Sequence, residues 1–231
     1  MNKLNLKQLD EGIAAAIANA TSLIREAELL LQNKYHARAY ALAHIAREEL
    51  AKVTMLYAAG LKLLAGKQVD WAKLQKRFRN HTSKLYSDVL HTYITNGIGG
   101  QNIPDNYLKI MLLGTTVRNE WKNDSLYVGL KDGSFKTPTE MIAERKALRT
   151  IEIAHFTLSD TNNYLVAAGK LSKRKPLNFD KILASLNYPK EMEVESGLEF
   201  VKQLSKIFHE HSLNSTKEKE CNKSSSDSVN S

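Results

Sequence analysis

Four polar side chains of types that can transfer protons or bind phosphate lie on or beside the apolar faces of predicted helices: Glu49, His81, Arg118 and Asn119. At about 100° of helical phase per residue, Glu49 lies about 20° from Leu42, inside an apolar stripe. Asn119 lies about 20° from Leu108 on another stripe. His81 lies at the boundary of a third apolar face. If these helices pack together, the four side chains meet in one polar cluster.

Such a cluster fits two roles. A carboxylate, an imidazole and a guanidinium can form an active or ligand site, because perturbed titratable groups gather at functional sites. The same groups can form a hydrogen-bonded core network that fixes the register of the helices. Helical phase alone leaves both roles open. In either role we expect Glu49 to have a cationic or hydrogen-bonding partner from another helix, because an unpaired buried carboxylate is costly.

A basic surface is predicted for the segment 71–84, which mixes five Lys or Arg residues with two aromatic residues. Such a segment can bind a phosphate backbone. As an amphipathic helix with a solvated basic face, it would need no ligand. The whole chain carries a net charge of +8, and the excess lies on residues 1–211. This charge favours a polyanionic partner, either nucleic acid or an acidic protein.

The sequence holds no motif for a bound cofactor: no P-loop, no dinucleotide glycine pattern, no Ser or Cys nucleophile motif and no His-Glu-x-x-His. His81, Asp88 and His91 are metal-ligating types, but about three helical turns separate the two histidines. We therefore expect neither a cofactor nor a metal ion. The apolar runs are far shorter than the roughly 20 residues of a membrane span, so we expect no membrane partner.

The single cysteine, Cys221, lies in a polar C-terminal segment, so an intrachain disulfide is impossible. No apolar core typical of a signal peptide follows the first residues. We therefore expect a cytoplasmic protein.

Apolar residues recur every three or four positions along most of the chain, which predicts helices and no convincing strand. The clearest start has Thr137 at the N-cap, Pro138 at N1 and Glu140 at N3, which is the capping-box arrangement. The predicted helices cover residues 6–32, 35–65, 70–95, 104–122, 137–168, 180–187 and 191–211. Asp70 can cap the third of them, and Gly169 ends the fifth. Residues 127–133 are expected to form a turn or a short extended piece. The expected fold class is all-α, an antiparallel helical bundle with accessory C-terminal helices.

The domain organisation predicted from these elements has three parts. Residues 1–169 form the helical domain, and residues 170–211 form a basic linker with the accessory helices. Residues 212–231 are rich in Ser, Asn and Lys, which predicts a disordered tail.

Three blocks of sequence carry a family resemblance. Residues 27–52 have a leucine-rich helix end, a short turn, the pattern A-Y-x-L-A and then E-E-x-x-K. Residues 81–84 form a His-x-x-Lys segment. Leu-Tyr-Val at 126–128 is followed, after a short loop, by Phe-Lys-Thr-Pro at 135–138. In this order and spacing the chain resembles the AbiV family of abortive infection proteins.

The resemblance implies a helical fold of the HEPN type and a role in bacterial defence against phage. Many HEPN proteins are dimeric, metal-independent RNases, with a motif of Arg and a polar residue, a His a few residues later, and then a Tyr. Here Arg118 and Asn119 match the first half, and Tyr127 matches the Tyr. Positions 123–125, where the motif places its His, hold Asn, Asp and Ser. The acid–base residue is missing there, so an RNase would need His81 to supply it.

The leading hypothesis is an abortive infection protein that acts as a metal-independent endoribonuclease and halts translation or growth on infection. The candidate catalytic residues are Arg118, Asn119, His81 and Glu49. The candidate substrate-binding residues are Lys84, Lys52, Arg77, Arg79 and Tyr127. The expected partners are RNA, a phage-encoded activator protein and a second copy of the chain, with the homodimer interface near the helix 104–122.

Two other functions stay open at this point. The chain can be a non-catalytic HEPN-like module that binds a phage or host protein or RNA. It can also be a helical scaffold in which the polar cluster only fixes the packing of the helices.

Overall fold

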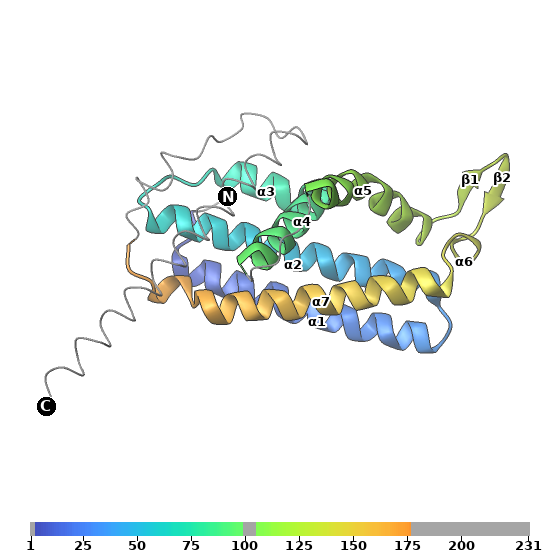
Figure 1. The fold of residues 1–231 in the computed structure, drawn as a ribbon, viewed down its shortest axis with the longest axis horizontal. Coiled ribbons are helices and arrows are strands. Elements are labelled where there is room, and N and C mark those ends of the chain that lie inside the picture. The colour runs from blue at the N-terminus through green and yellow to red at the C-terminus, as the bar shows by residue number, and fades with distance from the viewer. Residues whose placement is uncertain (1–2, 99–104, 177–231) are drawn as a thin grey trace, which may run out of the picture. The chain divides into compact units, whose positions relative to one another are not determined.

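The computed structural model describes residues 3–98 and 105–176 (Figure 1). The predicted accessory helices and the predicted tail, residues 180–231, lie outside the described residues.

The chain divides into two compact units. The first consists of Met1–Thr92 and Ile110–Asn178, and the second of Tyr93–Lys109 and Phe179–Ser231. The described part of the second unit is helical. All side-chain contacts below belong to the first unit.

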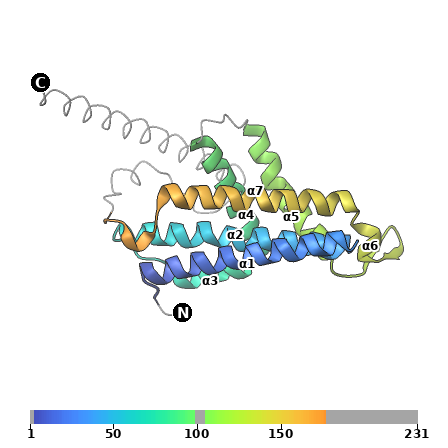
Figure 2. The same cartoon turned by 90° about the horizontal axis from the view of Figure 1, so that it is seen from below.

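Three long helices form the body of the first unit: α1 (Leu6–Gln32), α2 (His36–Leu64) and α7 (Glu144–Ala168). Figures 1 and 2 show them side by side. A turn at residues 33–35 makes α1 and α2 antiparallel, whereas α7 runs parallel to α2 (Figure 1). The structure confirms the all-α fold class and the predicted span of the first helix. None of the described helices is long and apolar enough to cross a membrane.

The helix α2 is the centre of the core, because 18 of its 29 residues are buried. Near its start, alanines of α1 and α2 pack against α7 and Ile142, and the small side chains let the helix backbones approach closely. Near its end, Val53 and Leu56 pack against Leu9 of α1 and against Trp71. A helix with so many buried residues buries more than one face, which affects where its polar residues can lie.

The helix predicted over 70–95 is two helices, α3 (Trp71–Arg79) and α4 (His81–Ile98). Asp70 caps α3 as expected, since its carboxylate accepts from the backbone N–H of Lys73 over 2.8 Å. Between the helices, Asn80 has an extended backbone, with φ −91° and ψ 115°. Its side-chain oxygen accepts from the backbone N–H of Ser83 over 2.8 Å, which starts a new helix at His81.

A small hairpin follows α5 (Asp105–Asp124), in the segment expected to be a turn or a short extended piece. Its strands are β1 (Gly129–Lys131) and β2 (Ser134–Lys136), which pair antiparallel. The expectation of no strand is therefore wrong at this point. Asp132 and Gly133 have φ of 50° and 74°, the left-handed pair that a tight hairpin turn needs.

The helix predicted over 137–168 is also broken, into α6 (Pro138–Met141) and α7. The capping box is confirmed, because the Glu140 carboxylate accepts from both the backbone N–H and the hydroxyl of Thr137 over 2.7 Å. Ile142 then takes an extended backbone and is fully buried. Burial of this large apolar side chain accounts for the break. The α7 helix ends before Gly169, as expected from the sequence, with φ 73° at that glycine.

The chain beyond α7 packs back onto the bundle through the 3-10 helix η1 (Leu171–Lys173). The Asp10 carboxylate of α1 accepts from the backbone N–H groups of Leu171 and Ser172, each over 3.0 Å. Leu171 is fully buried. The first residues of the predicted linker are therefore anchored to the helical core.

Candidate active site

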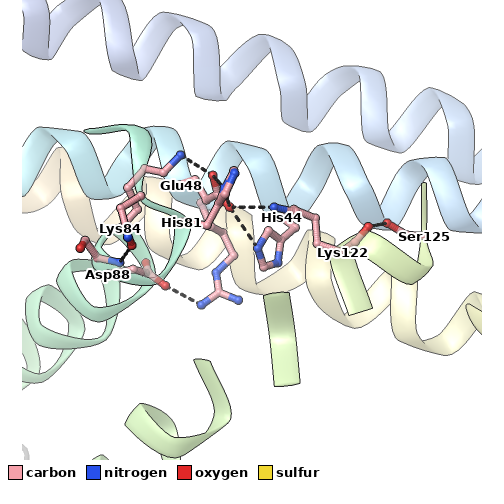
Figure 3. Close-up of polar contacts among 10 residues, drawn as sticks. His44, Glu48, His81, Lys84, Asp88, Lys122 and Ser125 are labelled. Atoms are coloured by element: carbon pink, nitrogen blue, oxygen red, sulfur yellow. Dashed lines mark hydrogen bonds and ion pairs between the residues drawn. The ribbon is translucent and has the colours of Figure 1, made fainter. Parts of the chain in front are cut away.

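Four polar side chains surround the carboxylate of Glu48, in the middle of α2 (Figure 3). It is only 2% exposed. His81 Nδ1 lies 2.7 Å from both of its carboxylate oxygens, and Lys84 Nζ donates to Oε2 over 2.5 Å. Both partners stand in the first turn of α4, which begins at His81, directly after Asn80. The break between α3 and α4 therefore places both groups on the same carboxylate.

Two further side chains approach Glu48 from other directions. His44 lies one turn earlier on α2, with its Nε2 3.4 Å from Oε1 of Glu48. Lys122 reaches from α5, with its Nζ 3.9 Å from the same oxygen. Neither ring nitrogen of the buried His44 has a hydrogen-bond partner in the described part of the chain, so its contact with Glu48 is electrostatic. Three helices thus converge on one carboxylate (Figure 3).

The charge state of this cluster follows from its surroundings. Burial by itself would raise the pKa of Glu48, but His44, the bond and charge of Lys84 and the bond of His81 together hold that pKa well below its ordinary value. Burial lowers the pKa of His44, and the Glu48 charge only partly opposes this effect. At neutral pH the cluster therefore holds an ionised Glu48 and a neutral His44.

The ionised Glu48 also fixes the tautomer of His81. A carboxylate can only accept, so His81 Nδ1 must donate the hydrogen, which leaves Nε2 of the neutral ring free to take a proton. The His81 side chain is 47% exposed, so a ligand can reach it from solvent.

A second ion pair holds α4 against α2. Arg47 Nη2 lies 2.5 Å from Oδ2 of Asp88, and both side chains are buried. Arg77 Nη2 of α3 donates to Ser87 Oγ of α4 over 3.0 Å. These contacts hold α4 against α2 and α3 at Ser87 and Asp88, about two turns beyond His81, and so help to position the start of the helix.

The structure corrects the prediction for Glu49. Its carboxylate is partly buried and pairs with Lys52 Nζ of the same helix over 2.5 Å. The expected partner from another helix belongs instead to Glu48. The prediction assumed that α2 buries a single apolar stripe. In the structure α2 is buried on more than one side, and the carboxylate of Glu48 is the one that faces α4 and α5. Lys52, a predicted substrate-binding residue, is therefore engaged with Glu49.

Arg118 and Asn119 lie on α5 and are partly buried. The Arg118 guanidinium folds back over Gly114, so a Cβ at that glycine would lie 2.9 Å from Nη1. Burial raises the pKa of Tyr40 to about 12, and the charges of Arg47 and Arg118 oppose this shift. Tyr40 lies two turns before Glu48, about 12 Å along α2. The α5 side chain that approaches the Glu48 carboxylate is Lys122.

The other predicted residues lie in different surroundings. Lys84 is buried against Glu48 rather than held out to solvent. Arg77 is tied to α4 through Ser87, and Arg79 is exposed. Tyr127 is exposed and lies just before the hairpin. The structure thus unites His81 and Lys84 in one cluster, and the roles predicted for Arg77, Arg79 and Tyr127 stay predictions.

Sequence reasoning missed three members of the cluster: His44, Glu48 and Lys122. One signal for Glu48 was present, since His44 and Glu48 are spaced by four residues and share a helix face. In the described chain, no group of three or more His, Cys, Asp or Glu side chains could hold a metal ion.

A comparison with models of protein families shows to which family the chain belongs. The family model HEPN_AbiV, described as AbiV, matches residues 8–159. This chain belongs to the AbiV family. The match runs from α1 into α7 and includes every member of the Glu48 cluster. No curated protein and no solved structure matches the chain.

Proposed function

We propose that this AbiV family protein acts in abortive infection by cleaving RNA, with His81 as the catalytic base. Membership of the family supports the role in abortive infection. The observation that carries the chemistry is the contact between His81 Nδ1 and the buried, ionised Glu48, which leaves a basic ring nitrogen on a half-exposed side chain. His81 thus supplies the acid–base group that positions 123–125 lack.

The proposed reaction needs one base at the start. His81 Nε2 takes the proton of an RNA 2′-hydroxyl while that oxygen bonds to the adjacent phosphorus, and the bond from phosphorus to the 5′ oxygen breaks. Solvent protonates the leaving 5′ oxygen. The products are a 2′,3′-cyclic phosphate and a 5′-hydroxyl end. Glu48 acts as a positioning residue, because it holds the ring with Nδ1 toward its carboxylate and Nε2 away from it.

Nearby cations favour the negative charge of the transition state. Lys84 and Lys122 both lie beside Glu48, so the cluster carries one positive charge in excess before His81 is protonated. A fixed positive field lowers the energy of an anionic phosphorane. We also retain Arg118 and Asn119 as candidates for phosphate contact, from the matching half of the family motif.

The same proposal includes the partners and the location. RNA is the substrate, and a second copy of the chain completes the site. A phage-encoded protein activates the enzyme, and the reaction takes place in the cytoplasm. The cut RNA would stop translation or growth of the infected cell.

Phage plating on cells that carry the protein tests the proposal. Wild-type protein should reduce plaque number, and His81→Gln should abolish the reduction because it removes the base. His155→Gln is the matched control: His155 Nε2 lies 2.7 Å from Glu28, in an exposed pair on the outer face of α1 and α7. Full protection by His81→Gln, at equal protein level, would contradict the proposal.

The hairpin favours a second candidate function, the binding of a phage or host protein without RNA cleavage. Leu130 and Phe135 are directly opposed across β1 and β2, and Phe135 is 77% exposed. Exposed apolar side chains of this size commonly mark contact surfaces. If this function holds, Phe135→Ser should lose protection and His81→Gln should keep it. The RNase proposal predicts that His81→Gln loses protection.

A further inference from the structure

A basic groove lies between α3 and the start of α4, outside the Glu48 cluster. It is an open cavity of about 580 Å³ between α3 and the start of α4. Its size falls within the range of about 300–1,000 Å³ that is typical of ligand pockets. The lining residues that matter here are Asp70, Lys73, Lys76, Arg77, Asn80 and Ser83.

The groove has an excess of positive charge. Lys73, Lys76 and Arg77 line it, against the one carboxylate of Asp70. That carboxylate already accepts the backbone N–H of Lys73 as the cap of α3. Nearby on α2, burial and then the charges of Arg77 and Lys73 lower the pKa of Lys62. An anion in the groove would relieve this crowding of like charges.

The groove is adjacent along the chain to the proposed reaction centre. Asn80 and Ser83 line it, and His81 stands between them in sequence at the first turn of α4. Arg77 of α3 is held in place by its hydrogen bond to Ser87 of α4. A chain molecule in the groove can therefore extend along the start of α4 to the half-exposed His81.

We propose that this groove binds the sugar–phosphate backbone of single-stranded RNA next to the bond that is cut. This inference rests on the proposed function, since it places the strand relative to His81. Phosphate oxygens suit the three cations, and Asn80 and Ser83 can bond to phosphate or sugar. No aromatic side chain is among the described residues that line the groove, so bases are not stacked there. Binding should therefore depend strongly on salt and weakly on sequence.

The test measures the binding of a short fluorescent RNA whose 2′-hydroxyls are methylated, so that it cannot be cut. Fluorescence anisotropy over a range of salt concentrations gives the dissociation constant and its salt dependence. The double variant Lys73→Gln/Lys76→Gln should weaken binding by about tenfold or more at low salt. It should also reduce the slope of log affinity against log salt by about 1.4, or about 0.7 per lost phosphate contact.

The matched control is Lys34→Gln/Arg38→Gln, which removes the same charge from two exposed residues, one in the turn before α2 and one in the first turn of α2. The groove lies near the other end of that helix, so a general effect of net charge would weaken both variants equally. Equal loss in the two variants would overturn the proposal, as would wild-type protein that does not bind the RNA. Binding of polyglutamate in place of RNA, with the same two groove lysines required, would also overturn it.

Failure of the proposed function gives a different result. If wild-type protein binds the methylated RNA through the groove but never cuts ordinary RNA, the groove stands and the RNase proposal fails. If ordinary RNA is cut while the groove variant keeps its affinity and salt slope, the groove proposal fails and the RNase proposal stands.

Discussion

Glu48 shows why a buried carboxylate can be retained inside an alanine-rich helix. Its partners His81, Lys84 and Lys122 come from α4 and α5, so one side chain connects three helices. A buried ion pair adds little net stability compared with apolar packing, but removal of one partner leaves an uncompensated charge. The carboxylate therefore matters both for the packing and for the state of His81.

Glu48→Gln should lower the free energy of unfolding by about 3–5 kcal/mol, because Lys84 and Lys122 lose their buried counter-charge. Urea denaturation followed by circular dichroism measures the change. Glu49→Gln is the matched control, and its partly exposed pair with Lys52 should contribute about 1 kcal/mol or less. Equal costs at the two positions would contradict the burial difference on which the site depends.

The free energy of unfolding should fall in two steps as the pH is lowered. The pKa of His44 is below its ordinary 6.5 in the folded chain, so the unfolded chain takes up that proton first and stability falls below pH 6.5. The pKa of Glu48 is also lowered, so its contribution is complete above its ordinary 4.5 and is lost as the pH falls below that value.

Urea denaturation at a series of pH values checks both steps. In Glu48→Gln the step below pH 4.5 should become smaller, because one depressed carboxyl is gone. A variant with the same acid dependence as wild type would contradict the low pKa of Glu48.

At the scale of elements, the sequence predicted the helix ends and caps that depend only on neighbouring residues. The span of α1, the caps at Asp70 and Thr137 and the end of α7 before Gly169 all follow from the types of neighbouring residues. The breaks at Asn80 and Ile142 were not predicted, because each depends on contacts with the rest of the fold as well as on local sequence. Ile142 leaves the helical path to fill the core, a choice that periodicity cannot show.

The candidate site was only partly predictable for a related reason. His81 and Lys84 were visible as a His-x-x-Lys block, and the structure places both on one carboxylate. The choice between Glu48 and Glu49 needed the position of α4 and α5 around α2. Helical phase measures one helix at a time, and it cannot rank two neighbouring carboxylates on a helix that is buried on several sides.

Contact between η1 and α2 leads to a prediction at the scale of elements. A Cβ at Gly60 would lie 2.4 Å from Cδ1 and 3.0 Å from Cγ of the fully buried Leu171. Gly60→Ala should therefore lower stability by about 1–3 kcal/mol despite its better helix propensity. Thermal denaturation measures this. In a protein that already carries Leu171→Ala, Gly60→Ala should lower the stability only slightly. A loss as large as in the wild-type protein would show that contact with η1 is not the cause of the destabilisation.

At the scale of the whole molecule, α5 offers a surface for the proposed homodimer. Leu113 and Val117 lie one turn apart on α5 and are exposed, beside Arg118. Symmetric dimers are the commonest oligomers, and an apolar stripe on one helix can pack against its own copy. The proposed interface therefore lies close to the residues that match the family motif.

Sedimentation should give a particle of twice the 26.0 kDa chain mass at micromolar concentration. Leu113→Glu/Val117→Glu should give a monomer, because four carboxylates would face one another across the interface. Leu148→Glu, at an exposed apolar position on α7, is the control and should leave the dimer intact. A wild-type monomer would contradict the shared site.

The most direct test of the proposed chemistry is the single-turnover cleavage rate of one end-labelled RNA, measured with a metal chelator present. Wild-type protein should cut the RNA and leave 2′,3′-cyclic phosphate ends, and His155→Gln should cut at the same rate. His81→Gln should cut about 10²–10⁴-fold more slowly, the usual contribution of a general base. Cleavage by His81→Gln at the wild-type rate, or activity that the chelator abolishes, would contradict a metal-independent reaction at His81.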